Sequence, residues 1–292
     1  MLIRLSFYLI SLITAFQSNS VVGCQINSLS IEPIATPYSY DVFANGPYAV
    51  TNSYKAAADI VGENCHVEMS LQMEDITTTL TGSNQQTLAF TWAGGNGTSV
   101  SNQWQFVLTE QSPSAIIQMR YPAKQWLPAG SYSGTLQLAV AYSSMLNQTP
   151  LSPAITTVNV MVNPIAKIQF YGLTQRQYDL DLGNLYSNKV ISNAPNLWVQ
   201  SNSPYQITVT SSHQGKLRHQ SNDGQWDIDY QLSFDSQVID LDLLEAQVNK
   251  SEMTSGLPIA LNFVIGDTFN RPGGKYSDTL DISIEPLLSQ QP

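Results

Sequence analysis

The stretch P-A-G-S-Y-S-G-T-L-Q-L at residues 128–138 returns near the end of the chain as P-G-G-K-Y-S-D-T-L-D-I at residues 272–282. In both copies a proline and a glycine precede a tyrosine, and apolar and polar residues alternate after it. Alternation with a period of two is typical of a half-buried β-strand, and Gly and Pro mark the turn before it. The phrase therefore predicts one kind of strand in two places, and its second copy puts Leu280, Ile282 and Ile284 on a single face.

Two further blocks of the sequence repeat in the same order as this phrase. The dipeptide Tyr-Asp at position 40 returns at position 178, an offset of 138, and residues 61–71 match residues 199–209 at the same offset. The phrase itself returns at an offset of 144, from position 128 to position 272, so the drift between blocks is only six residues. Such internal similarity indicates two copies of one structural unit.

Short alternating segments separated by Gly, Pro, Asn and Ser clusters occur along most of the chain, which favours immunoglobulin-like β-sandwiches. Helical periodicity is nearly absent, and we interpret the one candidate, residues 242–253, as a loop with a helical turn. We expect an all-β chain with two tandem immunoglobulin-like sandwiches, at residues 24–163 and 164–292. Strands are expected at residues 66–73, 135–142, 157–163, 205–211, 227–234 and 279–285.

The two copies differ after the repeated phrase. The first copy continues into another alternating segment, residues 156–163, whereas the second copy is succeeded only by P-L-L-S-Q-Q-P. We expect this segment to complete the first sandwich, and the second to lack its final strand; the alternative is that it completes the second. A missing strand leaves unpaired edges, so the second sandwich is expected to borrow a strand from another chain. The residues expected to line its groove are Leu280, Ile282 and Ile284.

The first residues have the features of a secretory signal peptide. Arg4 precedes an apolar run of 12 residues and then the polar stretch Q-S-N-S, which is the pattern of an export signal. The run is shorter than the roughly 20 residues that span a bilayer as a helix. We expect residues 1–23 to be a signal peptide, with cleavage between Ser18 and Gly23. The alternative is a lipid on Cys24, which V-V-G-C suggests.

Cys24 and Cys65 are the two cysteines of the chain. In an exported protein such a pair most simply forms a disulfide. In the chain-entropy model, a bond that closes a loop of about 40 residues stabilises the fold by roughly 4 kcal/mol. A free thiol pair or a metal pair is the alternative, but no histidine lies at ligand spacing.

Charged residues form only 12% of the chain, with 22 Asp and Glu against 12 Lys and Arg. This acidic balance repels phosphate groups, so we expect no nucleic-acid partner. The three histidines lack partner cysteines and HxH spacing, and no Ser, His and Asp residues form a recognisable catalytic order. We therefore expect no catalytic residue, no metal and no cofactor, and hence no enzyme.

Aromatic residues near the loops of the first copy are the candidates for binding. Trp92, Trp126, Tyr38 and Tyr48 lie beside turn signals, where exposed rings could stack on a glycan or contact an apolar surface. Two other aromatic residues, Tyr40 and Trp104, are expected to pack in the core.

Several blocks of the sequence resemble the spore coat protein U family, which includes the subunits of archaic (Csu-type) chaperone–usher pili. The second copy carries most of the resemblance, and the first copy carries it more loosely. The blocks are residues 178–185, 198–217, 227–232 and 273–284 in the second copy, and Cys24, Tyr40, Asp41, Cys65 and residues 129–138 in the first.

The resemblance implies a sandwich that a periplasmic pilus chaperone completes, until an adjacent pilus subunit donates a strand during assembly at the outer-membrane usher. It also implies a two-domain subunit that is exported, passes through the periplasm and is displayed at the cell surface as a structural and adhesive pilus tip. Because few residues would precede Cys24 after cleavage, this chain is expected to have no donor strand of its own. The alternatives are a periplasmic pilus chaperone and a self-contained secreted binding module.

Overall fold

The structure is a computed structural model that describes residues 24–35, 39–142 and 151–287. Within these ranges the regular structure is β-strand apart from two short helical turns, which confirms the expected all-β fold. The expected signal peptide lies outside the described residues. No helix in the described part is long and apolar enough to cross a membrane. The helical elements are two single 3-10 turns, η1 (Ser83–Gln85) and η2 (Gly224–Trp226).

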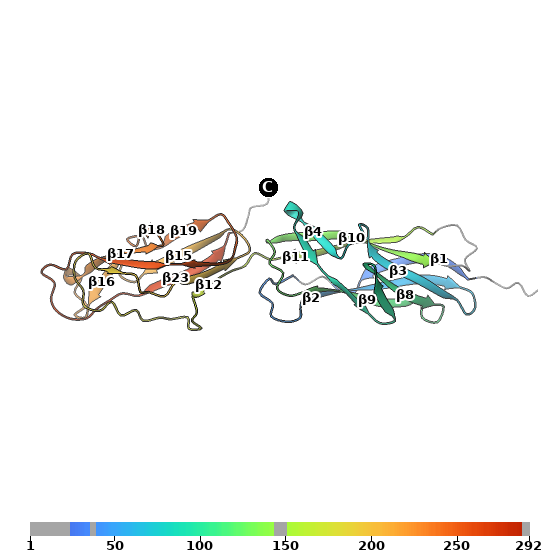
Figure 1. Cartoon of the computed structure of the whole chain (residues 1–292), viewed down its shortest axis with the longest axis horizontal. Coiled ribbons are helices and arrows are strands. Elements are labelled where there is room, and N and C mark those ends of the chain that lie inside the picture. The colour runs from blue at the N-terminus through green and yellow to red at the C-terminus, as the bar shows by residue number, and fades with distance from the viewer. Residues whose placement is uncertain (1–23, 36–38, 143–150, 288–292) are drawn as a thin grey trace, which may run out of the picture.

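Eleven strands form the N-terminal sandwich and enclose the first hydrophobic core (Figure 1). They are β1 (Gln25–Pro33), β2 (Tyr48–Val61), β3 (His66–Met73), β4 (Thr79–Gly82), β5 (Thr87–Ala89), β6 (Thr91–Gly94), β7 (Gly97–Val100), β8 (Gln103–Thr109), β9 (Ser114–Pro122), β10 (Gly130–Tyr142) and β11 (Ala154–Val162). One sheet has the order β1-β2-β9-β6. The other has the order β5-β4-β10-β3-β8-β7, and β11 also pairs with β10.

Twelve strands form the C-terminal sandwich around a second hydrophobic core. They are β12 (Ala166–Phe170), β13 (Val190–Ile191), β14 (Leu197–Ser201), β15 (Tyr205–Ser211), β16 (Lys216–His219), β17 (Ile228–Phe234), β18 (Gln237–Ile239), β19 (Ala246–Lys250), β20 (Thr254–Ile259), β21 (Leu261–Ile265), β22 (Tyr276–Ser277) and β23 (Leu280–Pro286). The sheets have the orders β12-β14-β20, β19-β15-β23 and β13-β21-β17-β16-β22, with β18 beside β17. Figure 1 shows the two sandwiches end to end.

The repeat seen in the sequence is also a repeat of strand register. In the N-terminal sandwich Leu136 of β10 lies opposite Met73 of β3, and in the C-terminal sandwich Leu280 of β23 lies opposite Ser211 of β15. The second pair is the first pair shifted by the two sequence offsets, 144 and 138. A slip of one residue would turn every apolar side chain outward, so the matching register shows that both copies use the same inward face.

The repeated phrase adopts the same conformation in both copies. Gly130 and Gly274 have φ angles of +150° and +155°, in a region that glycine enters far more readily than other residues. The hydroxyl groups of Tyr132 and Tyr276 each donate a hydrogen bond to the carbonyl oxygen of the proline four residues earlier, at 3.1 Å and 2.8 Å. The glycine and the tyrosine therefore form the entry to the strand in each sandwich.

The expected strands agree closely with the structure, with one exception. β3 and β15 match the expected ranges 66–73 and 205–211 to the residue. The interpretation of residues 242–253 as a loop with a helical turn is wrong, because they contain β19. Ala246 and Val248 are alternate residues of β19, and both point into the second core, where they are buried.

The disulfide between Cys24 and Cys65 is confirmed, with the two Cα atoms 5.6 Å apart. Cys24 directly precedes β1 and Cys65 directly precedes β3, so the bond joins the two sheets of the N-terminal sandwich. The Glu110 carboxylate accepts hydrogen bonds from the amides of Asn64 and Cys65, both at 2.9 Å. Backbone hydrogen bonds from its own amide and from these two lower the pKa of Glu110.

We expect thiol labelling of the denatured, unreduced mature protein to find no free cysteine. The same sample after reduction is the control and should label at both cysteines. Replacing both cysteines by serine should destabilise the N-terminal sandwich by roughly 4 kcal/mol, because the unfolded chain regains the conformational entropy that the disulfide-closed loop had removed. Two reactive thiols before reduction, or a lipid mass on Cys24, would contradict the bond.

Candidate functional site

In the N-terminal sandwich, β11 fills the slot beside β10. It pairs antiparallel with β10 over its whole length, from Gly130 opposite Val162 to Leu138 opposite Ala154. On its other side, Tyr40 forms a parallel bridge with Val162. The expectation that residues 156–163 complete the first sandwich is therefore confirmed, and the alternative that they complete the second is wrong. The inward side chains Val158, Val160 and Val162 are fully buried.

The equivalent slot of the C-terminal sandwich lies between β12 and β23. β12 pairs with β14 on one side and β23 pairs with β15 on one side. Among residues 24–35, 39–142 and 151–287, no strand pairs with the other edge of either. β12 and β23 lie next to each other, as their labels in Figure 1 show, without forming a ladder. The C-terminal sandwich thus has an open slot where the N-terminal sandwich has β11.

Apolar side chains line this slot, and we call the slot between β12 and β23 the groove. Alternate residues of β12 and β23 face the second core but are only half-buried. The β10 counterparts of Leu280 and Ile282 are Leu136 and Leu138, which are fully buried beneath β11. The counterpart of Ile284 is Val140, which lies beyond the ladder with β11 and is half-buried too. The structure thus places all three residues expected to line the groove on this face of β23. The half-buried residues of the two strands are Ala166, Ile168, Phe170, Leu280, Ile282 and Ile284.

A buried carboxylate lies between β22 and β23, next to the groove. The Asp278 side chain is only 2% exposed. It accepts hydrogen bonds from Ser211 Oγ at 2.5 Å, from Tyr230 Oη at 2.7 Å, and from the backbone amide and Nδ1 of His213, both at 3.0 Å. Burial, together with this carboxylate, raises the pKa of the Tyr230 hydroxyl. Sequence reasoning missed this cluster, although the repeated phrase carries a signal of it: the first copy has Gly134 where the second has Asp278.

The expected binding aromatics do not gather into one patch. Trp92 is buried, at 8% exposure, and its indole N–H donates to the carbonyl oxygen of Asn102 at 2.9 Å. The expectation that Trp92 is exposed is therefore wrong, because Trp92 falls on the inward face of β6, against Phe90. Tyr38 lies outside the described residues. As expected, Tyr40 and Trp104 are buried in the core.

The two remaining aromatics lie on the surface or close to it. Tyr48 is 41% exposed, and the Arg120 guanidinium lies 5.6 Å from its ring centroid. Trp126 is half-buried and packs edge-to-face on Phe43, at 5.7 Å between ring centroids. Because Lys167 of the C-terminal sandwich lies 3.8 Å from the Phe43 ring centroid, Trp126 is near the junction between the sandwiches.

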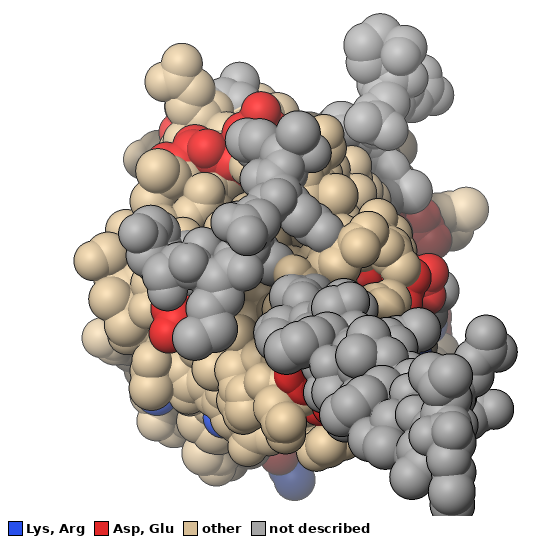
Figure 2. All heavy atoms as spheres, turned by 90° about the vertical axis from the view of Figure 1, so that its right-hand side faces the viewer, with Lys and Arg blue, Asp and Glu red and all other residues tan. Residues whose placement is uncertain are grey.

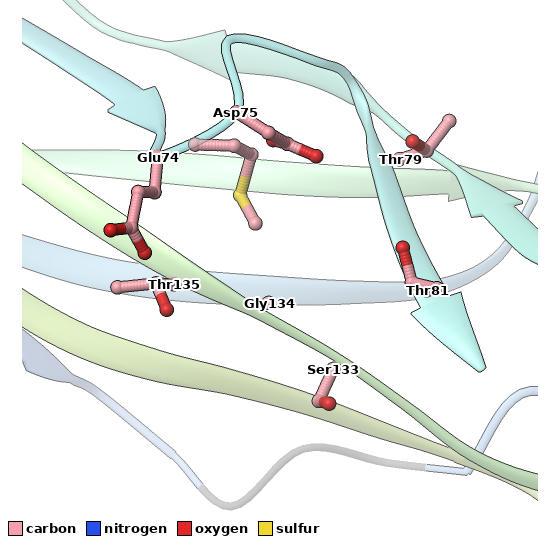
Figure 3. Close-up of a pocket in the computed structure, with 8 residues that line it drawn as sticks. Glu74, Asp75, Thr79, Thr81, Ser133, Gly134 and Thr135 are labelled. Atoms are coloured by element: carbon pink, nitrogen blue, oxygen red, sulfur yellow. The ribbon is translucent and has the colours of Figure 1, made fainter. Parts of the chain in front are cut away.

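Besides a small hollow of about 280 Å³ along β1 and β2, the described part of the N-terminal sandwich has one of about 260 Å³ beside β10. Figure 3 shows Glu74, Asp75 and Thr79 on one side of it, and Ser133 and Thr135 of β10 on the other. Two carboxylates are few for a metal site, and the part of the chain that the structure describes has no cluster of three or more His, Cys, Asp and Glu residues. At the far end of this sandwich, Figure 2 shows mostly uncharged residues, with acidic groups outnumbering basic ones.

No protein-family model and no curated protein sequence matches the chain. Solved structures show distant likenesses. A chain of the CsuC–CsuE chaperone–tip adhesion subunit complex from archaic Csu pili of Acinetobacter baumannii is 13% identical, with 76% of this chain and 85% of that chain covered and a TM-score of 0.42. The CupB6 tip adhesin of Pseudomonas aeruginosa is 11% identical, with 90% and 94% covered and a TM-score of 0.44. The Salmonella SafD adhesin is 10% identical, with 47% and 98% covered and a TM-score of 0.33.

Proposed function

We propose that the chain is a tip subunit of a chaperone–usher pilus. In this proposal, residues 24–163 form a self-complete adhesive domain, and residues 164–292 form a pilin domain that receives a strand from another protein. The observation that carries the proposal is the apolar slot between β12 and β23, open where β11 fills the equivalent slot of the first sandwich. The distant likenesses to pilus adhesins agree with this reading but add no weight to it.

A donor strand would remove two defects of the C-terminal sandwich at once. It would pair the unpaired backbone groups along β23, which are a template for association with other chains. It would also bury three or four apolar side chains of its own, each worth roughly 1.5–3 kcal/mol. The sum, about 5–10 kcal/mol, is comparable with the net stability of a whole domain. The open groove therefore favours a subunit that is stable only in an assembly.

The partners follow from this mode of completion. A periplasmic pilus chaperone would fill the groove first, and an adjacent subunit would replace it at the outer-membrane usher. The chain would thus be exported, pass through the periplasm and reach the cell surface. A pilus chaperone supplies a strand and needs no receiving groove, so the groove favours a subunit over the chaperone alternative. The tip position is suggested by the two tandem sandwiches, because two-domain subunits of the family that the sequence resembles stand at the pilus tip.

The ligand of the adhesive domain would be a glycan or an apolar surface. Among the members of the expected set that the structure describes, Tyr48 is exposed, and Trp126 is a half-buried second candidate. Aromatic rings with one face in solvent suit both kinds of ligand. Trp92 is not part of this proposal, because its side chain is buried.

Co-purification with a pilus chaperone tests the proposal. We expect the chain to form a stable complex with a chaperone of the archaic pilus type, and Ile282→Asp to abolish it, because a charge in the groove cannot be buried without a partner. Ser283→Asp is the matched control, since Ser283 is the exposed neighbour of Ile282 on β23, and it should leave the complex intact. A chain that never co-purifies, or two variants that bind equally well, would contradict a strand-receiving groove.

A further inference from the structure

The pairing of β11 with β10 in the N-terminal sandwich gives the register that we expect for a strand docked in the groove of the C-terminal sandwich. Each inward residue of β11 lies opposite one residue of β10, and the offset of 144 assigns each β10 residue an equivalent in the second copy. The pairs are Val162 with Gly130, Val160 with Tyr132, Val158 with Gly134, Thr156 with Leu136 and Ala154 with Leu138. The equivalents of the β10 residues are Gly274, Tyr276, Asp278, Leu280 and Ile282.

Four of these five positions have the same or a similar residue in both copies, and the exception is Gly134, which corresponds to Asp278. In the first copy a Cβ atom on Gly134 would collide with the terminal methyl of Met73, which fills that space. In the second copy the residue equivalent to Met73 is Ser211, and its hydroxyl bonds to the Asp278 carboxylate. An apolar side chain that reaches across from β3 is thus replaced by a carboxylate from the segment between β22 and β23.

We propose that Asp278 determines which donor strand the groove accepts: a strand with a small hydroxyl residue opposite Asp278 and apolar residues at the neighbouring inward positions. The inference rests on the proposed function of the groove. A docked strand moves water further from a carboxylate whose side chain is already only 2% exposed. Burying a charge is costly unless polar groups surround it. A hydroxyl group opposite Asp278 adds a dipole near the carboxylate that Ser211, His213 and Tyr230 already bind, whereas a valine there adds only apolar surface.

The selection has a consequence for the chain itself. β11 of a second copy would place Val158 opposite Asp278, so β11 is a poor donor for this groove. Two copies of the chain are therefore discouraged from exchanging strands, which would block the groove before the right partner arrives. Specificity of this kind comes from a penalty on the wrong partner as well as from a good fit to the right one.

Three peptides based on residues 154–162, A-I-T-T-V-N-V-M-V, test the proposal by fluorescence anisotropy with the full chain. Relative to the parent peptide, Val158→Ser should bind about tenfold more tightly, since it faces Asp278. Val160→Ser is the matched control and should bind about tenfold more weakly, since it faces Tyr276 and loses apolar contact. In the chain variant Ser211→Met/Asp278→Gly, which copies the N-terminal slot, the parent should bind more tightly than the Val158→Ser peptide.

The other possible outcomes contradict, in turn, the selection by Asp278, the register of the strand and the groove as a strand acceptor. If the parent binds as tightly as the Val158→Ser peptide while Val160→Ser weakens binding, the groove takes a strand in this register but Asp278 does not select it. If all three peptides bind equally, the register is wrong and the inference fails with it. If no peptide binds, the groove is not a strand acceptor, and the proposed function fails too. If the double variant does not fold, the comparison of the three peptides on the natural chain still tests whether Asp278 selects the strand.

Discussion

Fusing a donor strand to the C-terminal end of the chain is expected to raise the Tm of the C-terminal sandwich by at least about 10 °C. The strand would be patterned on β11, with serine opposite Asp278, and joined through a flexible linker. It would pair with β23 and cover Leu280, Ile282 and Ile284, which are half-buried without it. A gain of about 5 kcal/mol from apolar burial corresponds to such a shift, since each kcal/mol is worth roughly 2–8 °C in domains of this size.

Differential scanning calorimetry of the full chain measures this effect, because the two sandwiches have separate cores and should unfold as separate transitions. The N-terminal transition is an internal control and should stay in place. A fused strand with its inward apolar residues replaced by serine is a second control and should raise Tm little. A cooperative C-terminal transition that neither strand moves would mean that the sandwich is complete, and the pilus proposal would lose its physical basis.

The repeat made much of the fold predictable from the sequence. Strand alternation is a local property, so the ranges 66–73 and 205–211 could be located without knowing their partners. The two offsets also relate the register of β3 with β10 to that of β15 with β23, because a duplicated unit keeps the same strand pairing. The completion of the first sandwich could be expected for the same reason, since an alternating segment at residues 156–163 follows the first copy of the phrase.

Features that depend on contacts between distant residues could not be predicted in this way. Asp278 meets Ser211, His213 and Tyr230 only after β15, β17 and β23 have packed together. Trp92 lies beside a glycine-rich turn, which suggests exposure, but its position within β6 turns the ring into the core. Which face of a short strand points inward is decided by its sheet, and the sequence of that strand alone does not contain this information.

Replacing Val160 by aspartate is expected to unfold the N-terminal sandwich while the C-terminal sandwich stays folded. Val160 is fully buried on β11, opposite Tyr132, so the variant would place a charge without a partner in the first core. Such a burial belongs to the changes that cost more than about 4 kcal/mol, a large share of the stability of a domain. Calorimetry should show the N-terminal transition lost or shifted far below that of the natural chain, with the C-terminal transition retained.

Met161→Asp is the matched control for this experiment. Met161 is the next residue on β11 and carries the same substitution, but its side chain is 48% exposed on the outer face of the sheet. Substitutions at exposed positions usually change stability by about 0.5 kcal/mol or less, so the N-terminal transition should hardly move. If the two variants behaved alike, β11 would not be the strand that completes the first sandwich. The open groove of the second sandwich would then lose the filled counterpart from which its function is inferred.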